Sequence, residues 1–207
     1  MEISYEKATE KDVKEIINIQ HKLNQMLNLD YVKEETFWQY FEEILKNDIR
    51  NETSIYYLAK KENSIVGCIC IELYEDELIS DVGSFNYGIP LIFVNERCRN
   101  GKIALKLFKL AIHEIQKRGC NTLTMSVEDN NPNKYLHFAI ADILLDKREE
   151  QLVDCGTTTQ YVLGSTDISR FAKLTMKEFM NMALEVKRNF KKVIENLQIT
   201  ESNISIV

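Results

Sequence analysis

The first part of the chain alternates apolar and polar residues in periods that predict one short strand followed by two amphipathic helices. Residues 3–7 have the composition of a strand, and Thr9 followed by Asp12 is a capping pattern for a helix start. Apolar residues then recur at helical spacing at Val13, Ile16, Ile17, Leu23 and Leu27. A second helix is predicted from the apolar residues Phe37, Phe41, Ile44 and Leu45.

The middle of the chain changes to the shorter period of strands and then returns to helix. Residues 55–60 and 65–73 predict a hairpin around a polar turn, and residues 89–94 predict another strand. The helix that follows is expected to end at Gly119, because a glycine after basic residues is a common helix stop. Its apolar positions are Ile103, Leu107, Leu110, Ala111 and Ile115. A further strand is predicted from the alternating apolar residues Leu123, Met125 and Val127.

Beyond this strand the pattern predicts a helix, a strand and a linker. Pro132 suits the first position of a helix capped by Asn131, and we expect that helix to reach Arg148. Residues 157–163 predict a final strand. Residues 164–169 are mostly small and polar, which indicates a short linker.

The last helix has the spacing of a coiled-coil seam. Thr175 and Glu178 form a capping box at its start. Seven apolar residues then recur in steps of three and four: Met176, Phe179, Ala183, Val186, Phe190, Val193 and Leu197. We expect this seam either to pair two copies into a homodimer or to pack on the first two helices of its own chain. The chain is therefore divided into a domain at residues 1–165 and a helical extension at residues 166–207.

Composition narrows the class of protein. The 207 residues are 44% hydrophobic, which suffices for a packed domain with an appendage. A net charge of −6 disfavours nucleic acid as a partner and suits a cationic substrate. No apolar run approaches the roughly 20 residues of a membrane-spanning helix, and no secretory signal is evident, so we expect a cytoplasmic protein without a membrane partner. The five cysteines include no C-x-x-C pair, so we expect neither a disulfide framework nor a metal site.

The segment from position 94 to position 104, V-N-E-R-C-R-N-G-K-I-A, predicts a turn that binds phosphate. Amides at a helix N-terminus have no intrahelical acceptor and lie at the positive end of the helix dipole. Gly101 allows the backbone to approach a ligand closely, and Arg99 and Lys102 add positive charge. The alternative is an ordinary strand–helix–strand crossover with a solvated basic turn.

This segment resembles the GNAT superfamily of acyl-CoA-dependent N-acetyltransferases, which writes it as V-x-P-E-Y-R-G-K-G-I-G. Val94, Arg99, Ile103 and Ala104 fall on the Val, Arg, Ile and final Gly/Ala of that motif without a gap. The resemblance implies the GNAT fold, an α/β (α+β) class with a central mixed, mostly antiparallel twisted sheet flanked by helices. The predicted order of strand, two helices, three strands, helix and strand agrees with it.

The resemblance also implies a function and a set of coenzyme-binding residues. Acetyl-CoA would be the co-substrate, and the acetyl group would pass to a primary amine of a small molecule or a protein. In the family, the main chain of the strand at residues 89–94 lines the pantetheine arm and donates to the oxyanion. The residues thereby assigned to the coenzyme are Ile92, Phe93, Val94, Arg99, Asn100, Gly101, Lys102, Ile103, Ala104 and Asn131. The alternative is a non-catalytic acyl-CoA-binding or regulatory module on the same fold.

Two departures from the motif lie in the turn. Asn100 replaces a common Gly, and Lys102 occupies the inner Gly position. The Lys102 side chain would either crowd a bound phosphate or reach around to neutralise it.

The position of the general acid departs further from the family. Its motif N-x-x-A-x-x-L-Y-x-K-x-G-F places either Phe138 or Leu145 on the proton-donating Tyr, depending on the letters aligned, and neither can donate a proton. Tyr135 and His137 lie on the same predicted helix and are the candidates for the acid. The alternative is that both are structural residues with hydrogen-bonded polar tips.

An acidic run begins where the predicted hairpin ends. In the family this region borders the acceptor cleft, so Glu72 and Glu75 are the candidates for binding a cationic amine and relaying its proton through water. The alternative is a solvated acidic edge.

Overall fold

The computed structural model describes residues 2–27, 35–74, 86–99, 101–120, 123–128, 152–154, 158–163, 165–182, 184–185 and 188. Within them a seven-stranded sheet has the order β1-β2-β3-β4-β5-β7-β6. Its strands are β1 (Ser4–Lys7), β2 (Ser54–Lys61), β3 (Ser64–Tyr74), β4 (Asn86–Val94), β5 (Leu123–Glu128), β6 (Leu152–Asp154) and β7 (Thr158–Leu163). Neighbouring strands are antiparallel except β4 and β5, which are parallel. This confirms the α/β class with a mixed, mostly antiparallel sheet.

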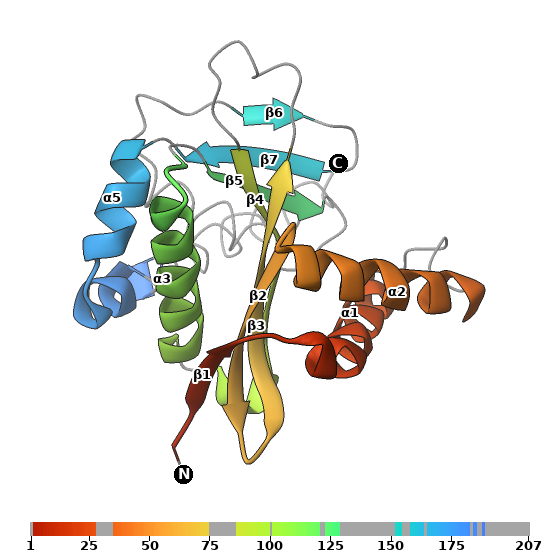
Figure 1. The fold of residues 1–207 in the computed structure, drawn as a ribbon. Helices are drawn as coiled ribbons and strands as arrows, with labels where there is room; N and C mark the ends of the chain where they lie inside the picture. Colours follow the sequence, from red (N-terminus) through yellow and green to blue (C-terminus); the bar gives the residue numbers. More distant parts are fainter. Residues whose placement is uncertain are drawn as a thin grey trace, which may run out of the picture.

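Helices cover both faces of the sheet (Figure 1). On one side lie α1 (Val13–Leu27) and α2 (Glu35–Asn51), and on the other lie α3 (Lys102–Lys117) and α5 (Ser165–Lys173). Both predicted N-terminal helices, the hairpin of β2 and β3, and the helix ending near Gly119 are confirmed. None of the described helices is both long enough and apolar enough to cross a membrane.

Alternate residues of the central strands supply two hydrophobic clusters, because successive strand side chains point to opposite faces. Ile55, Ile69 and Ile71 belong to the cluster under α3 and α5. Tyr56 and Cys70 belong to the cluster under α1 and α2. Cys68 and Cys70, two residues apart on one face of β3, both pack in this second cluster as small apolar residues.

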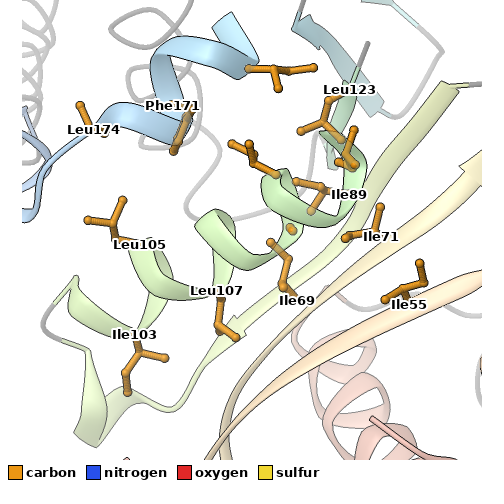
Figure 2. Close-up of a cluster of buried hydrophobic side chains, with 14 of the residues drawn as sticks. Ile55, Ile69, Ile71, Ile89, Ile103, Leu105, Leu107, Leu123, Phe171 and Leu174 are labelled. Carbon is orange, nitrogen blue, oxygen red and sulfur yellow. The ribbon is translucent and has the colours of Figure 1, made fainter. Parts of the chain in front are cut away.

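Helix α3 is buried on two sides, which its predicted single stripe does not account for. Figure 2 shows Leu107 pointing towards the strand that carries Ile69, and Leu105 pointing the other way, towards Leu174. Leu105 and Leu107 are 2% and 0% exposed. The second side is covered by α5, whose Phe171 ring lies 5.6 Å from that of Phe108.

The predicted linker at residues 164–169 is wrong, because α5 begins at Ser165. The predicted linker contains Ser165, Thr166 and Asp167, whose residue types also favour a helix N-terminus. Ile168, Phe171 and Leu174 then follow at three-residue spacing and enter the core. The division at residue 165 stays a prediction, although its extension begins with core-forming residues.

Thr175 and Glu178 form the predicted capping box. The Glu178 carboxylate accepts hydrogen bonds from the Thr175 amide at 2.8 Å and its hydroxyl at 2.6 Å. Helical residues follow at 176–182. Their apolar residues Met176, Phe179 and Met182 pack on the cluster of α3 and α5. The expected packing of these seam residues on the first two helices is therefore wrong, since α1 and α2 lie on the opposite face (Figure 1).

The short strand β6 was not predicted, and three residues carry too little period to reveal it. The predicted helix from Pro132 to Arg148 lies outside the described residues.

Candidate active site

Strands β4 and β5 are paired over only part of the length of β4. The pairs are Tyr87–Leu123, Gly88–Thr124 and Ile89–Met125. On its other edge β4 continues to pair with β3 through Val94, which faces Gly67. From residue 91 to residue 94, β4 thus has a sheet partner on one edge and none from β5 on the other. Among the described strands, none pairs with the backbone groups on that second edge.

A β-bulge marks the point where this opening begins. Cys70 pairs with Leu91 and Glu72 pairs with Gly88, so that one residue of β3 stands opposite Ile89 and Pro90 of β4. Proline has no amide hydrogen to donate to a ladder, so it is compatible with a bulge and not with a regular central strand. Bulges of this kind bend a strand and redirect its neighbours. Pro90 is the residue in the sequence that indicates this bulge. The prediction of the strand does not take it into account.

The turn after β4 delivers the chain to the N-terminus of α3. The Asn95 side chain accepts a hydrogen bond from the amide of Arg97 at 3.1 Å. Gly101 then adopts a left-handed conformation, with φ +78° and ψ −27°, and its carbonyl accepts the amide of Leu105 at 3.0 Å. The amides of the first helical turn precede this bond and have no acceptor within the helix.

Arg99 is fixed beside the turn by the strand it follows. Its Nε donates to the carbonyl oxygen of Val94 at 3.0 Å, and its side chain is half exposed. A guanidinium carries five N–H donors, so this bond leaves donors for an anion. Oε1 of Glu96 lies 3.9 Å from Nη1 of Arg99.

Close packing on β3 sets the position of α3. A Cβ added to Gly67 would lie 2.8 Å from Cγ2 of Ile103 and 3.2 Å from the carbonyl oxygen of Phe93. The helix therefore approaches the sheet at a residue without a side chain, next to the last pair of β3 with β4. Ile103 is a core residue, 1% exposed.

The backbone conformation explains why Lys102 can occupy the inner Gly position of the motif. The left-handed position is Gly101, and Lys102 is already the first residue of α3, with an exposed side chain. The position that requires glycine in this chain is thus one residue earlier than the inner Gly of the motif.

Several predicted site residues lie together around the opening. Ile92 and Val94 pack partly against the cluster of α3, and Phe93 packs against the cluster of α1 and α2. Ala104 is half-buried in the first turn of α3. Their roles stay predictions, as do those of the residues outside the described ranges: Glu75, Asn100, Asn131, Tyr135 and His137.

Glu72 lies on β3 directly after the residue that stands opposite the bulge. It is half-buried, pairs with Ser54 and Gly88, and accepts a long hydrogen bond of 3.4 Å from the Ser54 hydroxyl. On β3 it shares a face with Cys70, so it projects to the side of α1 and α2.

A buried polar group near Glu72 was not predicted. The Tyr56 hydroxyl accepts a hydrogen bond from Nε2 of Gln20 at 3.1 Å, and Tyr56 is 4% exposed. Burial, with Cys70, Cys68 and Glu72 nearby, raises the pKa of Tyr56 well above its ordinary value. The hydroxyl therefore stays protonated at neutral pH. In the sequence, the available signal for this buried group was Tyr56, a tyrosine that alternates with apolar residues in β2. In the described part of the chain, no cluster of three His, Cys, Asp or Glu residues is arranged to hold a metal ion.

Comparison with solved structures shows the same fold in known acetyltransferases. An acetyltransferase of the GNAT family from Staphylococcus aureus Mu50 matches with a TM-score of 0.58 and 15% identity, over 79% of this chain and 99% of that one. The PaiA N-acetyltransferase of Thermoplasma acidophilum, solved with coenzyme A, gives 0.56 and 14%, with the same coverage. A predicted acetyltransferase of Clostridium acetobutylicum, solved with acetyl-CoA, gives 0.57 and 14%, over 66% and 88%.

Sequence comparison identifies the family. No curated protein sequence matches the chain. The family model described as Acetyltransferase (GNAT) family matches residues 18–137, which is more than half of the chain; the match begins within α1 and includes the β4 opening and the turn before α3. Together with the seven-stranded sheet and its parallel β4–β5 pair, this match shows that the chain belongs to the GNAT acetyltransferase family.

Proposed function

We propose that this protein is an N-acetyltransferase that uses acetyl-CoA and acts on a primary amine. The observation that carries the proposal is the opening between β4 and β5, which begins at the bulge and ends at the N-terminus of α3. An opening in which the described residues of β5 do not pair with β4, with helix amides at its end, suits an extended thioester with a phosphate group.

The residues present fit such a coenzyme. The edge of residues 91–94 supplies backbone donors and acceptors for an amide-containing arm. Gly101 and the first turn of α3 supply amides for phosphate, and Arg99 adds a positive charge that is already oriented by Val94. When bound, acetyl-CoA supplies the activated acetyl group. The protein contributes orientation, and a β4 amide would stabilise the oxyanion that develops on the carbonyl.

Acetyl transfer forms a C–N bond and breaks a C–S bond, so the amine must lose a proton and the departing sulfur must be protonated or stabilised. An alkylamine with a pKa near 10.4 is unprotonated at pH 7 in roughly one molecule of a few thousand. Glu72 and Glu75 are proposed to bind the cationic amine and to relay its proton through water. Tyr135 or His137 is proposed as the acid that protonates the sulfur.

Thiol release from acetyl-CoA across a panel of amines tests the proposal, with binding of coenzyme A measured in parallel by calorimetry. Turnover with at least one amine supports an enzyme. Binding without turnover by any amine would favour the alternative, an acyl-CoA-binding or regulatory module. Failure to bind coenzyme A would overturn both.

Lys102→Ala probes the turn, with Lys106→Ala as the matched control, because Lys106 is exposed one turn further along α3. If Lys102 attracts phosphate, the affinity for coenzyme A falls and depends less on salt. If Lys102 obstructs phosphate, the affinity rises. The control should change neither quantity appreciably.

A further inference from the structure

The helical residues 176–182, called here the C-terminal helix, lie beside the N-terminal end of α3 (Figure 1). A Cβ built on Gly101 would be 2.9 Å from the sulfur of Met180 and 3.3 Å from Cε1 of Phe179. Met180 and Phe179 therefore fill the space into which a side chain at Gly101 would project. No motif in the sequence predicts this contact, because about eighty residues separate its two sides.

The C-terminal helix is built into the domain. Its start is fixed by the capping box, in which Glu178 accepts two hydrogen bonds from Thr175. The stripe Met176, Phe179 and Met182 packs into the cluster of α3 and α5. Displacing this helix from the turn would expose all three apolar side chains to water.

Met180 lies off this stripe. It is half-buried, it is outside the core cluster of the described residues, and its sulfur lies against Gly101. Its packing thus concerns the turn more than the core. Met180 is for this reason the more specific probe of the contact.

The contact restricts the conformations that the turn can adopt. Glycine has the largest conformational freedom of any residue, so a turn that depends on left-handed Gly101 loses the most entropy when it becomes ordered. Phe179 and Met180 occupy the side of Gly101 to which a side chain would project. The amides of the first turn of α3 point along the helix axis, away from its body.

We propose that Phe179 and Met180 are positioning residues of the coenzyme site, which hold the Gly101 turn in its phosphate-binding conformation. This inference rests on the proposed binding of an acyl coenzyme at that turn. It makes docking of the C-terminal helix and binding of coenzyme A favour each other, and thermodynamic linkage requires the effect to be reciprocal. If the C-terminal helix instead blocked the turn, its docking and the binding of coenzyme A would disfavour each other.

Calorimetry of coenzyme A binding to Met180→Ala and Phe179→Ala tests whether this coupling is favourable. Leu184→Ala is one control, because Leu184 is on the same segment and 50% exposed. Ile168→Ala is the second, because it removes packing from buried α5 without touching the turn. We expect the dissociation constant to rise roughly fivefold or more for the two variants, the lower end of typical coupling, and to change less for the controls.

Hydrogen exchange supplies a readout that does not depend on activity. Coenzyme A should slow amide exchange in residues 176–182 of the parent protein, and less so in Met180→Ala. Unchanged or tighter binding by Met180→Ala, or exchange that accelerates with coenzyme A, would overturn the inference while the parent still binds. If the parent does not bind coenzyme A, the proposed function fails and this inference fails with it. Should Phe179→Ala unfold, Met180→Ala decides alone.

Discussion

At the scale of single residues, two glycines with similar positive φ angles flank α3. Gly101 has φ +78° and Gly119 has φ +73°. A Cβ on Gly119 would meet nothing within 4 Å, whereas one on Gly101 would meet Met180 and Phe179. The two positions therefore share the conformational requirement and differ in packing, which makes Gly119 a matched control for Gly101.

We predict that Gly119→Ala lowers the free energy of unfolding by about 1–2 kcal/mol, the cost of a left-handed conformation for an L-residue. Gly101→Ala should cost more, because the added methyl also displaces Met180 and Phe179. Combining Gly101→Ala with Met180→Ala should recover part of the excess. Urea denaturation of Gly119→Ala, Gly101→Ala, Met180→Ala and the double variant measures these differences, and equal costs at the two glycines would contradict the contact.

The acid is a second question at this scale. We expect Tyr135→Phe or His137→Ala to lower the turnover number at least roughly tenfold, since a positioned general acid contributes at least that much. The affinity for coenzyme A should not change, which separates loss of proton transfer from loss of binding. If neither variant reaches that loss, both assignments are wrong.

At the scale of elements, the junction of α2 and β2 depends on ion pairs. Glu52 follows the last residue of α2 at φ +58°, accepts a hydrogen bond from Lys7 at 2.6 Å, and pairs with Arg118 at the end of α3. Lys7 and Arg118 lower the pKa of Glu52 from 4.5 to about 2. This carboxylate thus joins the ends of two helices to the first strand of the sheet.

Because the pKa of Glu52 is lowered by folding, its contribution to stability is present above pH 4.5 and is lost as the pH falls towards 2. Glu52→Gln should lower the free energy of unfolding at pH 7 by about 1 kcal/mol or less, since the carboxylate is half exposed and screened by salt. The difference from the parent should shrink between pH 4.5 and pH 2. Glu62→Gln is the control, as Glu62 is exposed and also left-handed, and no ion pair to it is found among the described residues. A difference independent of pH would contradict the ion-pair origin.

The elements also show what periodicity can and cannot predict. The hairpin, α3 and both capping patterns follow from local signals that sequence spacing contains. The start of α5 resembles a linker in sequence because the residue types that begin a helix are also the types that form loops. Only the apolar residues Ile168, Phe171 and Leu174 distinguish a helix from a loop here. In α3, Leu105 and Phe108 are apolar residues outside the predicted stripe, and they indicate that a second element covers the helix.

The site was predictable only where its parts are adjacent in sequence. The turn before α3 is one continuous motif. The opening beside β4 depends on where pairing with β5 ends, and pairing between strands thirty residues apart is a tertiary property. The contact of Met180 with Gly101 spans a still longer separation, so neither its existence nor its partner follows from the motif.

At the scale of the whole molecule, the remaining question is what covers the rest of the seam. Its first positions, Met176 and Phe179, pack within the chain on the cluster of α3 and α5. A homodimer would have to use the seam from Ala183 to Leu197, together with Leu184, which is 50% exposed. The seam positions Ala183, Val186, Phe190, Val193 and Leu197 lie outside the described residues. A helix there, as their spacing predicts, would present more apolar surface than a monomer usually leaves to solvent.

We therefore predict a homodimer through the later part of the seam. Val186→Glu combined with Phe190→Glu should give a folded monomer that still binds coenzyme A, because the residues packed at the turn are upstream and each copy keeps its own core. If the seam instead packs in its own chain, the same variant should lower thermal stability with no change in mass. Light scattering with thermal melts separates the outcomes, and Lys177→Glu controls for added negative charge on an exposed face of the same helix. A parent protein that is monomeric at tens of micromolar would rule the dimer out and leave the C-terminal helix as a purely intramolecular part of the domain.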